Sequence, residues 1–195
     1  MSTRLVGLSG SLRGSSCNTG LLRAAQRFLA NNHGITLTIV PIGALPLFNQ
    51  DDEKAASPAV AAYRASLEPA DGILLATCEY NSSVSAALKN AIDWGSRGKN
   101  LFNNKAAAIM GAGGYAGTTR AQGHLRDIAS AINMHTLTHP EVRVEIFKDP
   151  KPFNMVSGDV TCEATLGKVE MQMAAFAQYL QMIKSAPLDQ VRYRG

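Results

Sequence analysis

The residues best suited to chemistry lie in a hydroxyl- and glycine-rich segment near the N-terminus, residues 9–18. Its polar side chains include those of Ser11, Arg13, Ser15, Ser16 and Asn18. Short hydroxyl and amide groups around one guanidinium suit a phosphate monoester, and the helix expected next adds an N-terminus that favours anions. The segment has neither the GKS/GKT ending of a P-loop nor G-x-G-x-x-G spacing. We therefore predict a phosphate cradle, against the alternative of a simple turn in which Asn18 caps the helix.

Five apolar runs alternate with five segments of helical periodicity, and this alternation indicates the elements that must position the cradle. The predicted strands are residues 4–8, 35–40, 72–77, 106–110 and 134–138, and the predicted helices are residues 18–32, 58–67, 85–94, 120–132 and 163–183. Such alternation is typical of an α/β fold with a doubly wound parallel sheet. Right-handed crossovers favour the flavodoxin-like, five-stranded order 2-1-3-4-5.

In that strand order a ligand binds where the loops after the first and third strands meet. These loops are residues 9–18 and 78–84, and a glycine-rich loop at residues 111–119 is expected to follow the fourth strand on the same edge. We therefore expect three unusual loops to converge on one crevice.

Length and composition bound the kind of protein. The 195 residues, 46% of them hydrophobic, predict a single domain over 1–195 with residues 184–195 as a C-terminal tail. No apolar run approaches the roughly 20 residues of a membrane span, and no signal peptide is evident. Three distant cysteines fit a reducing compartment, so we expect a cytoplasmic protein. The scattered basic residues behind the net charge of +4 favour a small anionic ligand over nucleic acid. The four histidines fall on different elements, so no metal site is predicted.

Motifs in these loops resemble the NADPH-dependent FMN reductase family, and within it the small quinone and chromate reductases, some of which are azoreductase-like. They are Gly10-Ser11-Leu12-Arg13-x-x-Ser16-x-Asn18, Glu79-Tyr80-Asn81-x-Ser83, Leu88-Lys89-Asn90-Ala91-x-Asp93-Trp94, and Gly113-Gly114 followed by Gly117 and Arg120. The resemblance covers roughly residues 4–140. It implies bound FMN, NADPH or NADH as co-substrate, and ping-pong transfer of hydride through the flavin to quinone-like acceptors such as quinones, chromate, azo compounds or free flavin. It also implies homodimers or homotetramers.

The resemblance further implies roles for individual residues. The FMN phosphate would be held by Ser11, Arg13, Ser16 and Asn18, together with the backbone N–H groups of Cys17 and Thr19. The ribityl chain and the flavin edge would be lined by Glu79, Tyr80, Asn81 and Ser82. The flavin ring would approach the backbone closely at Gly113, Gly114 and Gly117. No side chain is assigned as a catalytic acid or base, and Glu79 is expected to anchor its loop, because hydride transfer to a flavin needs no side-chain proton.

The chain departs from the family pattern at two places. Cys78 stands where relatives commonly have proline, and Gly111-Ala112 stands where they often have Ser-Thr. Two other functions remain open at this point. Cys17 and Arg23 have the C-x5-R spacing of low-molecular-weight phosphatases, and a flavodoxin-like chain could also be a non-enzymatic FMN electron carrier.

Overall fold

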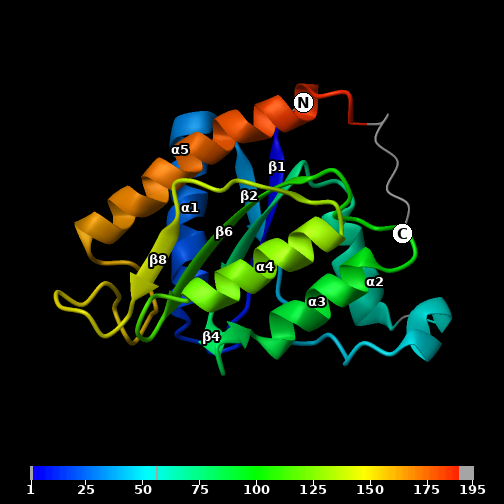
Figure 1. Cartoon of the computed structure of the whole chain (residues 1–195), viewed down its shortest axis with the longest axis horizontal. Coiled ribbons are helices and arrows are strands. Elements are labelled where there is room, and N and C mark those ends of the chain that lie inside the picture. Colours follow the sequence, from blue (N-terminus) through cyan, green and yellow to red (C-terminus); the bar gives the residue numbers. More distant parts are fainter. Residues whose placement is uncertain (1, 56, 189–195) are drawn as a thin grey trace.

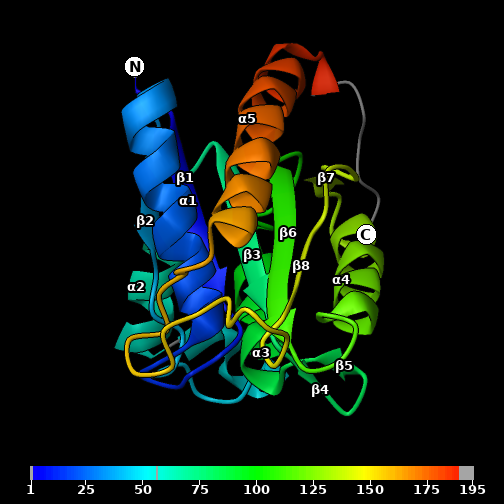
Figure 2. The same ribbon diagram turned by 90° about the vertical axis from the view of Figure 1, so that its left-hand side faces the viewer.

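The structure is a computed structural model that describes residues 2–55 and 57–188. It contains one large sheet with the order β2-β1-β3-β6-β7, in which β8 also pairs with β6 (Figures 1 and 2). The strands are β1 (Arg4–Ser9), β2 (Thr36–Ile39), β3 (Gly72–Thr77), β6 (Ala106–Gly113), β7 (His135–Thr136) and β8 (Val142–Glu145). All pairs in this sheet are parallel. The flavodoxin-like α/β fold and its strand order are therefore confirmed.

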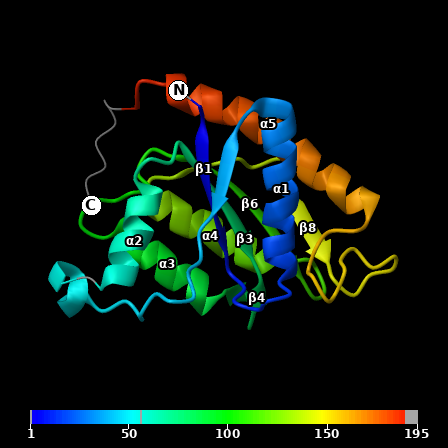
Figure 3. The same ribbon diagram turned by 180° about the vertical axis from the view of Figure 1, so that it is seen from behind.

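Helices cover both faces of the sheet (Figures 2 and 3). On one face lie α1 (Cys17–His33) and α5 (Glu163–Ser185), and on the other lie α2 (Pro58–Leu67), α3 (Ala86–Ser96) and α4 (Thr119–Ala131). Every residue of β3 is buried, as its continuous apolar run predicts for a central parallel strand. A short 3-10 helix (Gln50–Ala55) precedes α2, and an antiparallel hairpin of β4 (Glu79–Tyr80) and β5 (Ser83–Val84) follows β3.

The fifth strand position differs from the prediction. The predicted strand over 134–138 is only the two-residue β7, and β8, which was not predicted, pairs farther along β6 with Met110–Gly113. Pro140 lies between them and has no N–H for a sheet ladder. Gln122 of α4 donates to the Val142 carbonyl at 3.0 Å, and Gln172 of α5 donates to those of Ile109 and Pro140 at 3.0 and 2.9 Å. Two buried side chains thus satisfy backbone groups where the strand is interrupted.

Two predicted boundaries are also wrong. Residues 111–113 are not part of a loop, because they complete β6. The predicted tail begins too early, since residues 184 and 185 belong to α5, while its residues 189–195 lie outside the described part of the chain. None of the described helices is long and apolar enough to cross a membrane, and the three cysteines are free.

Candidate functional site

Three segments meet at the edge of the sheet where β1, β3 and β6 end, the lower edge in Figure 1. The Cys78 thiol donates to the Gly10 carbonyl at 3.3 Å, which joins the segment after β3 to the one after β1. A Glu79 carboxylate oxygen accepts hydrogen bonds from the backbone N–H groups of Arg120 and Ala121, both at 3.0 Å, which joins it to the segment after β6. The predicted convergence of the three segments is confirmed.

The first segment, residues 9–18, leads into the N-terminus of α1 as predicted. Ser16 is the N-cap, and its hydroxyl accepts from the Thr19 N–H at 3.1 Å. The N–H groups of Cys17 and Asn18 are the first of the helix, so they have no intrahelical acceptor and point out of its positive end. Arg13 is exposed and contacts the Ser15 hydroxyl at 3.4 Å. This donor set suits a phosphate dianion.

Open space lies directly beside this segment. A surface cavity of about 340 Å³ borders Ser9, Ser11, Leu12, Arg13 and Thr19 on one side and residues 39–43 on the other. The Thr19 hydroxyl donates to that of Ser9 at 2.9 Å, which orders one wall.

The side chain of Asn18 has a different position from the one that the resemblance implies. It is buried, its amide donates to the Ala112 carbonyl at 2.9 Å, and its oxygen accepts from the Ala112 N–H at 2.8 Å. Thr77, the last residue of β3, pairs with Gly111, so Ala112 lies beyond the end of β3. The Asn18 amide supplies the donor and acceptor that a longer β3 would have supplied.

The second segment is the hairpin over 79–84. Asn81 and Ser82 at its turn have φ of 49° and 62°, the signs of a type I′ turn. Thr118, the N-cap of α4, makes no side-chain cap bond, and the Glu79 carboxylate caps this helix instead. The expectation that Glu79 anchors the loop is therefore confirmed. Arg120 also donates to the Ser82 hydroxyl at 3.1 Å, which adds to the attachment of the hairpin to α4.

Tyr80 of this hairpin is 56% exposed and lies near both Cys78 and Arg13. The nearby Cys78 sulfur and partial burial raise the pKa of Tyr80, while the Arg13 charge acts in the opposite direction. Burial raises the pKa of the Cys78 thiol, and interactions with Ser85 and Tyr80 partly offset this. Cys78 is therefore a neutral hydrogen-bond donor near neutral pH, bridging the hairpin and residues 9–18.

The third segment contains the predicted ring-facing glycines, which differ in their surroundings. A Cβ atom at Gly113 would lie 2.7 Å from the Thr118 methyl carbon, and one at Gly117, where φ is +53°, would lie 2.8 Å from the Val144 nitrogen. Contacts within the protein thus account for both glycines. A Cβ at Gly114 would meet nothing within 4 Å, so of these three glycines only Gly114 faces open space.

Thr118 is a residue that the sequence motifs did not single out. A Cβ atom at Gly111, one of the two positions that depart from the family pattern, would lie within 2.0 Å of the Thr118 hydroxyl. The buried Thr118 side chain therefore fills the space that a serine at position 111 would need. The absence of Cβ at position 111 could have suggested a close neighbour, but nothing in the sequence identifies which one.

The phosphatase interpretation is wrong. The Arg23 side chain points to the loop after β8, where its Nε lies 2.7 Å from an Asp159 carboxylate oxygen and its NH2 donates to the Ser157 carbonyl at 2.8 Å. Burial raises the pKa of the Cys17 thiol, with Arg13 in partial opposition. A neutral thiol and an arginine engaged elsewhere cannot form a phosphate-cleaving pair.

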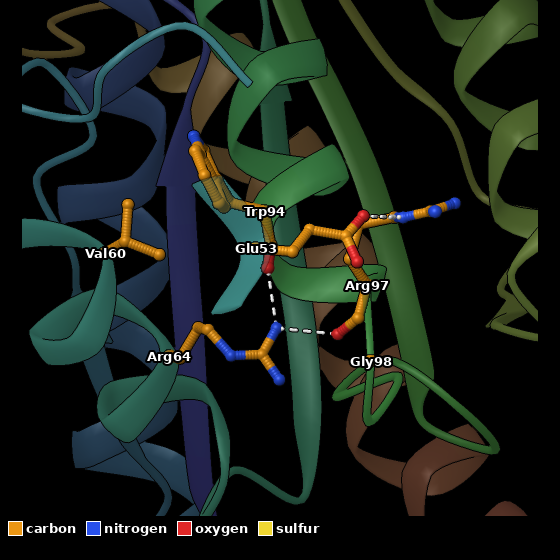
Figure 4. Close-up of a pocket in the computed structure, with 6 residues that line it drawn as sticks. All are labelled: Glu53, Val60, Arg64, Trp94, Arg97 and Gly98. Atoms are coloured by element: carbon orange, nitrogen blue, oxygen red, sulfur yellow. Dashed lines mark hydrogen bonds and ion pairs between the residues drawn. The ribbon is translucent and has the colours of Figure 1, made fainter. Parts of the chain in front are cut away.

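A smaller cavity of about 130 Å³ lies at the C-terminal end of α3 (Figure 4). Its charged side chains stabilise the end of that helix. Arg64 donates to the carbonyl oxygens of Trp94 at 2.6 Å, Arg97 at 3.0 Å and Lys99 at 3.0 Å, which satisfies the end of that helix. Arg97 in turn pairs with Glu53 at 2.7 Å. The guanidinium groups of Arg64 and Arg97 are therefore bonded to other groups of the protein. Among residues 2–55 and 57–188, no cluster of three His, Cys, Asp or Glu side chains could hold a metal ion.

The fold and the donor-rich segment after β1 define a flavodoxin-like α/β protein whose helix α1 begins with backbone N–H groups suited to an anion. More particularly, the chain belongs to the NADPH-dependent FMN reductase family, whose sequence model matches residues 3–149. It is 41% identical over 184 residues to the NADPH:quinone oxidoreductase of Arabidopsis thaliana, covering 91% of this chain and 93% of the relative.

It is also 41% identical over 144 residues to an NAD(P)H-dependent FMN reductase of Pseudomonas aeruginosa, covering 72% of this chain and 77% of the relative. Among solved structures it resembles the flavoenzyme NAD(P)H:(acceptor) oxidoreductase FerB from Paracoccus denitrificans. That match has a TM-score of 0.81 and 28% identity, and it covers 92% of this chain and 98% of the other.

Proposed function

We propose that the chain is an FMN-dependent NAD(P)H oxidoreductase that reduces quinones or similar small acceptors. Family membership and the names of relatives that are about 40% identical support this activity. The observation that carries the proposal is the set of donors at the start of α1. The free N–H groups of Cys17 and Asn18 lie beside Ser16 and the exposed Arg13, on the edge of the sheet that also carries the hairpin and Gly114.

These donors fit the phosphate of FMN. In the proposed complex the phosphate is held by Ser11, Arg13 and the hydroxyl of Ser16, with the N–H groups of Cys17 and Asn18. The Thr19 N–H is bonded to Ser16 and its hydroxyl donates to Ser9, so Thr19 shapes this end of the site and does not donate to the phosphate. The Asn18 side chain positions residues 9–18 through its two hydrogen bonds to the Ala112 backbone.

The ring end of the site is formed by the hairpin and the segment after β6. Glu79, Tyr80, Asn81 and Ser82 line the ribityl chain and the flavin edge, and the space at Gly114 accommodates the ring, with Gly113 and Gly117 maintaining the shape of the segment. When bound, FMN would supply the chemistry of hydride transfer between NAD(P)H and the acceptor. The protein orients the ring and needs no side-chain acid or base, and Glu79 is committed to capping α4.

An absorption spectrum tests the proposal directly. The purified protein, or the protein mixed with FMN and desalted, should show flavin bands that NADPH or NADH bleaches under argon and that a quinone restores. Parallel titrations with NADPH and NADH identify the preferred co-substrate. A protein that retains FMN but is bleached by neither nucleotide would instead be an electron carrier, and one that binds no FMN would refute the proposal.

We further propose that the whole chain is one domain, that it works in the cytoplasm, and that it forms homodimers or homotetramers. Three free cysteines support a reducing compartment. Large apolar side chains that stay exposed, among them Met171, Met182 and Leu47, support self-association. Light scattering of the flavin-loaded protein measures the assembly, and a monomer at all concentrations would contradict it.

A further inference from the structure

A compact loop over residues 153–160 lies against the start of α1. Its ends are joined by an antiparallel bridge between Phe153 and Val160, which are both buried in the core with α1 and α5. Within it, the Asn154 side-chain oxygen accepts two backbone N–H groups at 2.9 and 3.2 Å, and the Gly158 N–H donates to the Asn154 carbonyl at 2.7 Å. These bonds give the loop a defined shape.

The backbone of this loop touches the backbone of residues 16–20. A Cβ atom on Gly20 would lie 1.8 Å from the Gly158 carbonyl oxygen, so only glycine allows this approach. Gly158 has φ of +75°, and a Cβ there would lie 2.6 Å from the carbonyl oxygen of Ser16, the N-cap of α1. The absence of side chains at Gly20 and Gly158 therefore lets the loop contact the backbone at the start of α1, next to the proposed phosphate donors.

An ion pair holds the same two segments together one turn farther along α1. Arg23 Nε lies 2.7 Å from an Asp159 carboxylate oxygen, and Arg23 also donates to the Ser157 carbonyl at 2.8 Å. The hydrogen bond from Arg23 lowers the pKa of Asp159. Both side chains are partly exposed, 30% and 40%, so the pair acts on geometry more than on overall stability.

We propose that residues 153–160 are a positioning element for the phosphate end of the cofactor site. The Gly20–Gly158 contact and the Arg23–Asp159 pair fix where α1 begins, and hence where the N–H groups of Cys17 and Asn18 point. The inference rests on the proposed function. It assigns a role to a segment beyond residue 149, where the match to the family's sequence model ends.

The test compares FMN with riboflavin, which lacks the phosphate. Fluorescence titration of the full chain should give an Asp159→Asn variant that binds FMN about two- to fivefold more weakly, the range for an exposed ion pair, with riboflavin binding unchanged. Gly158→Ala should weaken FMN binding more than tenfold, because alanine is strained at φ of +75° and displaces Ser16. Glu68→Gln is the matched control, since it breaks an ion pair of 2.6 Å with Lys99 on another surface and should change neither affinity.

The outcomes separate the inference from the function beneath it. If both variants keep the wild-type preference for FMN over riboflavin, or lose affinity for the two equally, the inference is overturned while the proposed function stands. If the wild type itself shows no preference for FMN, the proposed phosphate site fails, and the inference fails with it. Should Gly158→Ala not fold in a urea titration, Asp159→Asn decides alone.

Discussion

Replacing Asn18 with alanine distinguishes a structural role for this side chain from a ligand-binding one. The substitution removes two hydrogen bonds, of 2.9 and 2.8 Å, and leaves the carbonyl and N–H of Ala112 without those partners beyond the end of β3. Because the site is buried, water does not readily replace the lost bonds. We therefore expect the ligand-free protein to lose stability.

The magnitude follows from the two backbone groups. An unpaired buried group costs about 1–3 kcal/mol, and the better helix propensity of alanine offsets about 0.5 kcal/mol. The two bonds share one side chain, so we expect the lower part of the summed range, a loss of about 2–4 kcal/mol in the free energy of unfolding. With a typical urea slope of about 2 kcal/mol per molar, the midpoint should fall by about 1–2 M.

Urea unfolding of the FMN-free protein, followed by far-UV circular dichroism and by the fluorescence of the single tryptophan, measures this loss. Asn18→Asp should be destabilised at least as much, because its carboxylate has no donor for the Ala112 carbonyl. Asn32→Ala is the control on the same helix, since Asn32 is exposed and its side chain donates to the Phe28 carbonyl of the preceding turn at 3.0 Å. An Asn18→Ala protein that unfolds like the wild type but binds FMN poorly would refute the structural assignment and restore the Asn18 side chain as a phosphate ligand.

Three further predictions follow from the charges and thiols. Arg13→Ala should weaken FMN binding about tenfold or more by fluorescence titration, since a charge-assisted contact contributes roughly 1.5–3 kcal/mol, and unchanged affinity would remove Arg13 from the site. An aromatic disulfide reagent should find one fast-reacting thiol in the absence of FMN. We expect Cys162, because backbone hydrogen bonds lower its pKa while burial raises those of Cys17 and Cys78; a fast thiol that persists in Cys162→Ser would contradict this. Burial lowers the pKa of Lys105 from 10.5 to about 8. Between these two pH values the unfolded chain holds a proton that the folded chain has released, so stability against urea should rise from pH 8 to pH 10.5. Because Lys105 is partly exposed, the rise should be less than about 2 kcal/mol. A Lys105→Met protein that keeps the same rise would assign it to other groups.

The architecture was predictable because local patterns carry it. The apolar runs of β1, β3 and β6 and the helical stripe of α5 each depend on residues that are close in the sequence. Once the alternation of strands and helices is given, the handedness of crossovers leaves few strand orders, and the parallel sheet then brings the loops after β1, β3 and β6 to one edge. The fold and the meeting of these loops at one edge therefore followed from the residue types and their spacing, and the family followed from the resemblance of the loop motifs.

Only the tertiary structure decided what each side chain at that edge contacts. The partner of Asn18 lies 94 residues away in the sequence, and the partner of Arg23 lies 136 residues away. The neighbour of Gly117 is Val144, in a strand that the sequence pattern missed. The type of a residue determines which hydrogen bonds its side chain can donate or accept. Its actual partner depends on the tertiary structure, because β3 ends before Ala112 and the distant Asn18 then supplies the hydrogen bonds that Ala112 needs.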